Sequence, residues 1–294
     1  MDDQPLTIRA ALTYGEGQLR GSDSPALDAR LLLEHVLQVN HTYLIAHGER
    51  ALDSRHEATY RRLVRRAALR EPIPYLTGWA PFYGRRFMVS PAVLIPRPDT
   101  ELLVERAIRW INDWPAERAI QPSSGPVVVD VGTGSGCVAI TLDLEISAGQ
   151  IEAVDISPAA LSIAARNAER LNASDRITFH QGSLLAPVSG QPDLIVANPP
   201  YIADPEWTGI DDGIKWYEPD IALRGGPDGL VVIRQLLDEA ARCLGPGGAV
   251  LCEIGWQQGP AARDLANSFF PQAQVEILPD FNGQDRVLAI QTVG

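Results

Sequence analysis

Apolar residues recur at helical spacing through the first part of the chain. One stripe, after the start signal Ser24-Pro25, consists of Leu27, Leu31, Leu32 and Val36. Another follows Ser54 and Glu57, which are spaced like a capping box. Apolar residues at this spacing are typical of short amphipathic helices. The pattern therefore predicts a small helical domain over residues 1–72.

The second of these helices has a basic face. Arginines occupy its non-apolar side at Arg61, Arg62, Arg65 and Arg66. Such a run can contact RNA or an acidic protein, but on a helix it is usually a solvated face. We favour the solvated face.

The helical pattern stops at residue 73. Prolines, glycines, aromatics and β-branched residues dominate from 73 to 97, and Gly84 stands between two short strand-like runs. This predicts a β-hairpin that links two domains. A further amphipathic helix is expected to start near Asp99, at the beginning of a second domain over residues 98–294.

Short buried-strand runs alternate with helical stretches in this second region. The runs lie at residues 127–131, 151–156, 194–197 and 249–254, and two antiparallel-looking strands follow near 275–278 and 286–291. Alternation of this kind predicts βαβ units and a parallel sheet, in a Rossmann-like α/β fold. Ligands bind such sheets beyond the carboxyl ends of the strands.

Composition narrows the class of partner. With 45% hydrophobic residues the chain can bury a full core, while its net charge of -12 and pI near 4.9 disfavour a long nucleic-acid duplex as substrate. A protein partner fits better. No apolar run is long enough to span a membrane, and the chain opens on Asp2 and Asp3 rather than on a basic segment, so we expect a cytoplasmic protein.

The cysteines do not indicate a metal site. Cys137, Cys243 and Cys252 are scattered through apolar stretches and lack the spacing of metal ligands. We expect buried, reduced thiols and no bound metal.

A glycine loop follows the first predicted strand. The strand ends at Asp130-Val131, the loop reads Gly132-Thr133-Gly134-Ser135-Gly136, and a helical segment comes next. Glycines allow a tight turn and leave N–H groups at the helix N-terminus free for a negative group on a ligand. The next strand ends at Asp155, whose carboxylate can accept both hydroxyls of a ribose. An adenosine-containing cofactor is implied.

The loop alone leaves a choice of cofactor. A nicotinamide-dependent oxidoreductase uses the same loop and acidic residue, but its spacing is Gly-x-Gly-x-x-Gly. The spacing here, Gly-x-Gly-x-Gly after an acidic residue, matches methyltransferases. A structural turn without a ligand is the simplest alternative.

The tetrapeptide Asn198-Pro199-Pro200-Tyr201 follows another buried strand. Two prolines make the turn stiff, so the Pro199 carbonyl is able to point into a pocket, and the Asn198 side-chain oxygen is a second acceptor. Two acceptors can hold both hydrogens of a planar NH2 group and expose its nitrogen to an electrophilic methyl group. Tyr201 would stack on that group or wall it in, and catalysis would rest on orientation rather than on a strong base.

Further segments resemble the release factor glutamine methyltransferases. They are residues 74–78, 94–101, 218–223, 253–255 and 257–259, and the most specific of them reads Ile-Pro-Arg-Pro-Asp-Thr-Glu. The resemblance implies a methyltransferase sheet with a small N-terminal helical domain that helps to recognise the substrate. It also implies that S-adenosylmethionine binds at Gly132 to Gly136, Asp155 and Asn198.

The same resemblance implies roles for the remaining site residues. Ser183 matches the position beside the adenine, where the family often has a larger or acidic residue. Asn198 to Tyr201 match the target site without departure. The implied substrate is the glutamine in the Gly-Gly-Gln loop of peptide chain release factors.

Two other functions are compatible with these motifs. The tetrapeptide also occurs in nucleic-acid adenine and guanine methyltransferases, although these need a basic recognition region. A cofactor-binding regulator without turnover is the other alternative, and it would be expected to have lost the tetrapeptide.

The connection over residues 201–228 contains Trp207, Trp216 and Tyr217, and we expect it to cover the substrate loop.

Overall fold

The computed structural model describes residues 6–114, 125–173 and 175–294. The chain divides into two compact units. One comprises residues 1–79 together with 211–217, and the other comprises residues 80–210 together with 218–294. The domain ranges expected from the sequence, 1–72 and 98–294, include short stretches that lie outside the described residues.

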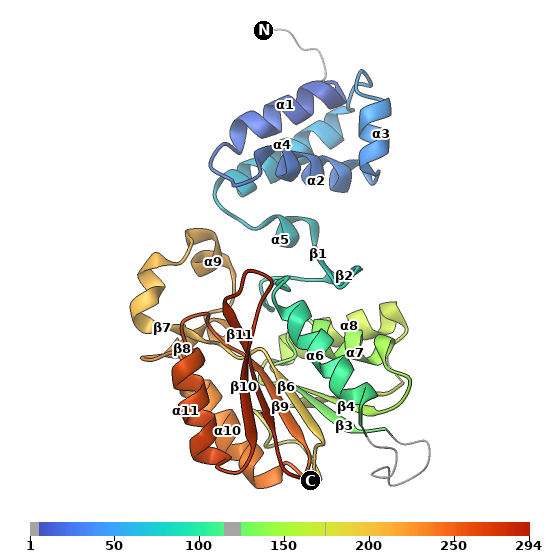
Figure 1. The fold of residues 1–294 in the computed structure, drawn as a ribbon. Helices are drawn as coiled ribbons and strands as arrows, with labels where there is room; N and C mark the ends of the chain where they lie inside the picture. The colour runs from blue at the N-terminus through green and yellow to red at the C-terminus, as the bar shows by residue number, and fades with distance from the viewer. Residues whose placement is uncertain (1–5, 115–124, 174) are drawn as a thin grey trace. The chain divides into compact units, whose positions relative to one another are not determined.

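Short helices around one apolar core make up the N-terminal unit (Figure 1). The helices that contribute to this core are α1 (Ile8–Gln18), α2 (Pro25–Leu37), α3 (His41–Ala46), α4 (Ser54–Ala68) and α5 (Ile73–Thr77). The unit also includes α9 (Asp212–Tyr217), from far along the chain. Tyr60 of α4 is fully buried, and its hydroxyl donates to the carbonyl of Ala29 in α2 at 3.2 Å. The predicted helical character of this region is confirmed.

The cap predicted for α2 is confirmed in position, and the one for α4 is wrong. Ser24 is the N-cap of α2. In α4, Asp53 rather than Ser54 is the N-cap, and its carboxylate accepts the N–H of His56 at 2.8 Å. The carboxylate of Glu57 instead accepts the N–H of Leu6 at 3.2 Å. Aspartate caps as well as serine does, so two adjacent candidates could not be separated by sequence.

The basic face of α4 is partly neutralised by its neighbours. Arg61 pairs with Glu57 at 2.9 Å and lies over the ring of Tyr14, 4.5 Å from its centroid. Arg66 pairs with Glu71. These contacts agree with the interpretation of the run as a solvated face.

The predicted hairpin is confirmed at residues 79–88, but the prediction is wrong for residues 73–77, which form the helix α5. A proline in its first turn and Gly78 with φ of 79° at its C-cap are compatible with a short helix there. Strands β1 (Trp79–Phe82) and β2 (Arg85–Met88) pair through a turn at Tyr83 and Gly84. Both turn residues have positive φ, 48° and 70°, as a two-residue turn matched to the twist of a hairpin requires.

A seven-stranded sheet forms the centre of this unit, in the order β10-β11-β9-β6-β3-β4-β5. Its strands are β3 (Val127–Val131), β4 (Gln150–Asp155), β5 (Ile177–Gln181), β6 (Leu194–Ala197), β9 (Ala249–Glu253), β10 (Gln274–Pro279) and β11 (Asp285–Gln291). Strands β3, β4, β5, β6 and β9 are parallel, and β11 is antiparallel to both neighbours. The predicted α/β sheet is confirmed. The sequence reading missed β5, an edge strand with a polar, half-exposed pattern.

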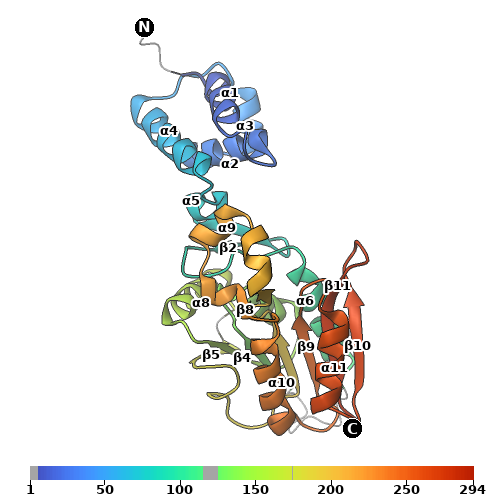
Figure 2. The same ribbon diagram turned by 90° about the vertical axis from the view of Figure 1, so that its left-hand side faces the viewer.

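Helices cover both faces of the sheet (Figures 1 and 2). One face packs against α6 (Thr100–Asn112), α7 (Cys137–Glu145) and α8 (Pro158–Leu171), and the other against α10 (Val231–Cys243) and α11 (Gly259–Phe269). Strand β3 lies between β4 and β6, so the strand order reverses there. A crevice is expected at that switch point, outside the carboxyl ends of the strands.

The long connection after β6 is structured throughout. It contains β7 (Ile202–Ala203), the 3-10 helix Asp204–Gly209, α9, the 3-10 helix Asp220–Ala222 and β8 (Arg224–Gly226). Strands β7 and β8 pair in parallel and close it. Its middle part belongs to the N-terminal unit, where Asp211 pairs with Arg70 at 3.3 Å. Within the described ranges, no helix is both long and apolar enough to cross a membrane.

Two glycines of α1 give a matched test of the N-terminal packing. A Cβ at Gly15 would overlap the hydroxyl of Tyr60 and lie 2.9 Å from the Cβ of Ala29, whereas one at Gly17 would meet nothing within 4 Å. We expect Gly15→Ala to lower the free energy of unfolding by ~1–3 kcal/mol through overpacking. Gly17→Ala should leave it unchanged or raise it by up to ~1 kcal/mol. Chemical denaturation of the full chain measures both, and equal effects would contradict this packing.

Candidate active site

A cavity of about 320 Å³ opens at the carboxyl ends of β3, β4 and β6. The predicted site residues that line it are Gly132, Thr133, Gly134, Ser135, Asp155, Ser183, Asn198, Pro199 and Pro200. Gly136 and Tyr201 belong to the same two segments but do not line the cavity. Segments 66 positions apart in the chain, at Gly132 and Asn198, therefore meet at one place.

The glycine loop adopts a backbone that side chains would disturb. Gly132, Gly134 and Gly136 have φ of 75°, 55° and 79°. A Cβ at either of the first two would have its nearest neighbour at 3.9 Å, so both face open space. A Cβ at Gly136 would lie 2.8 Å from the Cδ1 of Ile140. Gly136 therefore packs closely against helix α7, and it does not line the cavity.

Most N–H groups of the loop are used by the chain itself. Gly132 and Thr133 both donate to the Val154 carbonyl at 2.9 Å, and Gly136 donates to the Thr133 carbonyl at 2.8 Å. Gly134 donates to Asp155 at 2.8 Å. The expectation that these amides are free for an anion is therefore wrong. These bonds hold the turn, and Gly132 and Gly134 offer a ligand a surface without side chains.

Asp130 of β3 holds the glycine loop through hydrogen bonds. Its Oδ2 accepts the Thr133 hydroxyl at 2.7 Å and the N–H of Ala139 at 3.1 Å. The residue is only 2% exposed, and burial raises the pKa of its carboxyl to about 6. The sequence motif identifies Asp130 as the acidic residue before the loop, but it did not predict that Asp130 holds the loop through hydrogen bonds.

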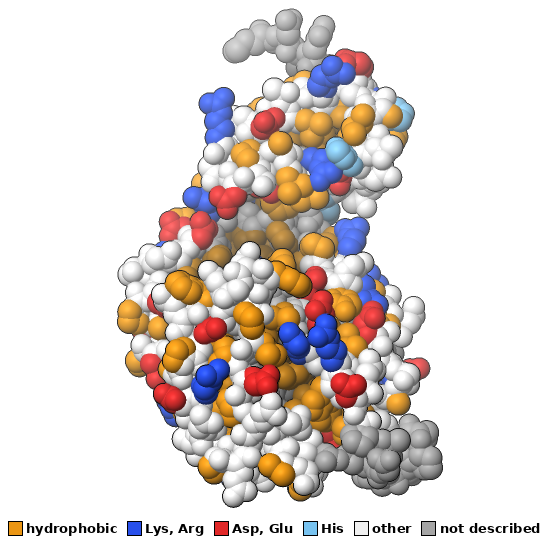
Figure 3. Space-filling model, in the orientation of Figure 1, with side chains coloured by type: hydrophobic (Ala, Val, Ile, Leu, Met, Phe, Trp, Pro, Cys, Tyr) orange, Lys and Arg blue, Asp and Glu red, His pale blue; other side chains and the backbone are white. Residues whose placement is uncertain are grey.

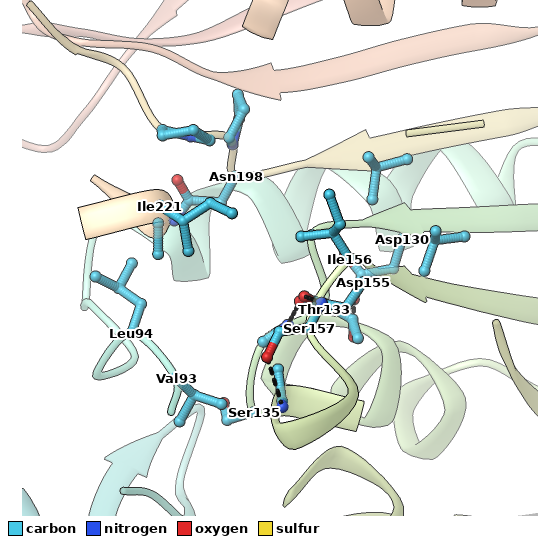
Figure 4. A pocket seen from close by; sticks show the side chains of 18 of the residues that line it. Val93, Leu94, Asp130, Thr133, Ser135, Asp155, Ile156, Ser157, Asn198 and Ile221 are labelled. Carbon is cyan, nitrogen blue, oxygen red and sulfur yellow. Dashed lines mark hydrogen bonds between the residues drawn. The ribbon is translucent and has the colours of Figure 1, made fainter. Parts of the chain in front are cut away.

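Asp155 faces the cavity from the end of β4 (Figure 4). Its Oδ2 accepts from Gly134 and its Oδ1 accepts the N–H of Ser157, each at 2.8 Å. A carboxylate has about four acceptor positions, so both oxygens can still accept ligand hydroxyls. Burial raises the pKa of this group.

Apolar and unpaired polar groups complete the wall around the loop. Ile156 beside Asp155 is 53% exposed, and Ile221 across the cavity is 61% exposed, although both are large and apolar. The buried Oγ of Ser135 has no hydrogen-bond partner among the described residues. Figure 4 shows Asn198, Ile221 and Leu94 on one side and Thr133, Ser135 and Asp155 on the other. A ligand with apolar and hydroxyl-bearing parts fits this lining.

Asn198 begins a chain of hydrogen bonds that leads through Thr100, which also lines the cavity, to the buried Glu253. Its Nδ2 donates to the Oγ1 of Thr100 at 2.9 Å, and Thr100 donates to the Oε2 of Glu253 at 2.7 Å. The hydroxyl of Tyr201 donates to the Oε1 of Glu253 at 3.1 Å. The Tyr201 carbonyl accepts from Gln258 at 2.8 Å. The tetrapeptide is thus held at both ends.

Burial shifts the titration of both groups at the end of this chain. Glu253 is 1% exposed, and its burial raises the pKa of the carboxyl, opposed by the two hydroxyls and by the charge of Arg286. Burial and the nearby Glu253 raise the pKa of the Tyr201 hydroxyl. Tyr201 therefore remains a neutral phenol at ordinary pH.

A second buried carboxylate organises the cavity rim. The Oε2 of Glu218 accepts the N–H of Ile95 at 3.1 Å, and its Oε1 pairs with Arg97. Glu218 is 4% exposed, while Arg97 lines the cavity. The resemblance pointed to both segments, but spacing alone gave no reason for them to meet, so the pairing was missed.

Charge and metal chemistry add little to this picture. On the face drawn in Figure 3, basic side chains are scattered among acidic ones. The described part of the chain contains no cluster of three or more His, Cys, Asp or Glu that could hold a metal ion. Cys137 and Cys252 are buried free thiols, whereas Cys243 is only partly buried.

The titration of Asp130 is testable through stability. Because its pKa rises from 3.8 to about 6 on folding, the folded chain binds this proton more tightly than the unfolded chain, so stability falls as pH rises through that interval. The contribution is roughly 3 kcal/mol at most. Asp130→Asn keeps an acceptor for Thr133 and Ala139 but removes the titration. Urea denaturation between pH 4 and 7 should show a smaller pH dependence in the variant, and identical dependences would contradict the assignment.

Known proteins resemble the chain in sequence and in fold. Residues 10–78 match the PrmC N-terminal domain, and residues 118–209 match the methyltransferase small domain. The release factor glutamine methyltransferase of Moorella thermoacetica is 40% identical and covers 96% of this chain and 97% of its own length. The protein of the same name from Bordetella pertussis is 41% identical and covers 82% of this chain and 86% of its own.

Among solved structures, the hMettl16 catalytic domain has a TM-score of 0.53 and 18% identity, and the alignment covers 71% of this chain and 77% of that one. At this identity the likeness concerns the fold alone. The two sequence relatives match most of this chain at 40% and 41% identity, and this similarity identifies the family. The resemblance drawn from the sequence is confirmed, and the chain belongs to the release factor glutamine methyltransferase family.

Proposed function

We propose that this enzyme transfers a methyl group from S-adenosylmethionine to the side-chain amide nitrogen of the glutamine in the Gly-Gly-Gln motif of peptide chain release factors. The observation that carries the proposal is the meeting of the glycine loop and the Asn198 tetrapeptide at one cavity. The names of the full-length relatives supply the substrate class. Such a reaction would tune translation termination in the cytoplasm.

The cavity suits S-adenosylmethionine, which when bound supplies an electrophilic methyl group on a sulfonium. Gly132 and Gly134 leave room for a ligand against the backbone. Asp155 has acceptor positions for the two ribose hydroxyls, as in other nucleotide sites at this place in the fold. Ser183 and the exposed apolar Ile156 would flank the adenine.

The target amide would be held by acceptors of the tetrapeptide. The Nδ2 of Asn198 is engaged by Thr100, which leaves its Oδ1 for the substrate. The Pro199 carbonyl is the second acceptor, since proline at the next position fixes the turn without needing a donor. Two acceptors that hold both hydrogens orient the amide nitrogen and draw its lone pair out of conjugation. Catalysis then rests on positioning and polarisation.

No strong base takes part in this scheme. Glu253, the buried carboxylate nearest the tetrapeptide, is separated from the cavity by Thr100 and Tyr201. Tyr201, whose ring does not line the cavity, would hold the turn through its contacts with Glu253 and Gln258, and burial keeps its hydroxyl protonated. The proton lost from the methylated amide would leave through water.

The connection over residues 201–228 and the N-terminal unit are proposed to bind the release factor. Pro219, Ile221 and Ala222 of this connection line the cavity. Its middle part belongs to the N-terminal unit and carries Trp216, which is 66% exposed. Large exposed aromatics are the side chains that most often anchor protein interfaces. One continuous segment therefore serves both the cavity and a surface for the protein substrate.

The activity is tested by methyl transfer from labelled S-adenosylmethionine to unmethylated release factor. We expect Asn198→Ala to lower kcat/KM by ~10²–10³-fold, as for the loss of one preorganised polar group at a reacting centre. Replacing the glutamine of Gly-Gly-Gln should abolish labelling by the native enzyme. DNA and RNA are included as competing substrates. Labelling of nucleic acid in place of the release factor would favour the amino-group methyltransferase alternative.

The role of the connection is tested with Trp216→Ala. We expect KM for the release factor to rise by about tenfold, equivalent to roughly 1.4 kcal/mol of lost contact, with no change in the dissociation constant of S-adenosylmethionine. Phe281→Ala is the matched control, because Phe281 is an aromatic that is 89% exposed outside this connection. Equal effects of the two variants on KM would refute the proposed role.

A further inference from the structure

The carboxamide of Asn198 can present either its oxygen or its NH2 group to the cavity. The two orientations have the same shape but opposite hydrogen-bond character. If the oxygen faces the cavity, it accepts a hydrogen of the target amide. If the NH2 group faces it, two donors oppose each other and the target is repelled. Something in the protein has to select the first orientation.

The buried contacts behind Asn198 supply that selection. Glu253 has one hydroxyl on each carboxylate oxygen, from Thr100 at 2.7 Å and from Tyr201 at 3.1 Å. The Oε2 of Glu253 accepts the hydrogen of the Thr100 hydroxyl. That leaves only lone pairs of the Thr100 oxygen for Asn198. The carboxamide must then turn its NH2 group to Thr100, as the 2.9 Å contact from Nδ2 shows.

We propose that Glu253, acting through Thr100, is a positioning residue that fixes the Asn198 carboxamide with Oδ1 toward the target nitrogen. This inference rests on the proposed function, since it concerns the same amide substrate. Thr100 is 2% exposed and Glu253 is 1% exposed, so water does not offer Asn198 an alternative partner on this side. The segments that contain Thr100 and Glu253 lie 153 residues apart, and the sheet and α6 bring them together.

The arrangement has a consequence for selectivity. An Oδ1 acceptor favours a glutamine amide and disfavours a glutamate carboxylate, which offers no hydrogen. A carboxamide that is free to flip can donate to the carboxylate instead. The Glu253–Thr100 pair is therefore expected to make the site discriminate a glutamine side chain from a glutamate side chain of the same shape.

Both arms of the carboxylate serve the same turn. The Tyr201 hydroxyl occupies the second oxygen of Glu253, and Gln258 holds the carbonyl of Tyr201. Arg286, which pairs with Asp99 and Asp280 at 3.2 Å, adds a favourable charge near Glu253. Removing Thr100 alone should thus release the orientation of Asn198 while the backbone of the turn stays in place.

The experiment compares Thr100→Val, Thr100→Ser and Thr141→Val in the full-length enzyme. Valine keeps the shape of threonine without its hydroxyl, and serine keeps the hydroxyl. Thr141 in α7 is the matched control, because it is fully buried and its Oγ1 has no hydrogen-bond partner among the described residues. For each chain, kcat and KM are measured on release factor, together with inhibition by a release factor that carries glutamate in place of the target glutamine. Melting temperature and S-adenosylmethionine binding report folding.

We expect Thr100→Val to lower kcat by about tenfold or more and to lower the preference for glutamine over glutamate by a similar factor. Thr100→Ser and Thr141→Val should retain both. If Thr100→Val does not fold, the double variant Thr100→Val, Glu253→Gln, which also replaces the carboxyl that has lost its Thr100 donor, is measured in the same way. Loss of kcat with an unchanged preference, or equal behaviour of Val and Ser at position 100, would overturn the inference. Absence of glutamine methylation by the native enzyme would instead overturn the proposed function.

Discussion

The pairing of β3 with β6 in the middle of the sheet is the constraint on which the site depends. Its register places Val131 opposite Ala197, so the glycine loop and the tetrapeptide leave neighbouring strands at the same level. Because parallel strands end at the same edge of a sheet, both segments open into one crevice. The glycine loop and the tetrapeptide are adjacent for this reason, although they lie 66 positions apart in the sequence.

Buried carboxylates hold the segments around the crevice in place through hydrogen bonds. Asp130 holds the glycine loop, Glu218 holds the segment that contains Arg97, and Glu253 holds both Thr100 and Tyr201. Each is almost inaccessible to solvent and each accepts hydrogen bonds on more than one side or from more than one donor. A buried carboxylate without such partners would be strongly destabilising, so these groups favour the loop arrangement in which their hydrogen bonds are made.

Much of this structure follows from the sequence, and the remainder depends on long-range contacts. The spacing of apolar residues and the residues typical of turns predicted the helical first unit, the hairpin at Gly84 and most strands of the sheet. The strand β5 was missed because its edge position leaves polar residues in it. The tetrapeptide and the glycine loop were recognisable as local motifs, whereas the Thr100–Glu253 and Arg97–Glu218 contacts join residues more than a hundred positions apart. No local pattern encodes such pairs.

The most direct test is a structure of the enzyme with the demethylated cofactor and a release factor bound. We expect the nitrogen of the Gly-Gly-Gln glutamine to lie within hydrogen-bonding distance of the Asn198 Oδ1 and the Pro199 carbonyl, with the Asn198 Nδ2 still bonded to Thr100. A glutamine nitrogen held by other groups, or an Asn198 side chain that contacts only the cofactor, would contradict it.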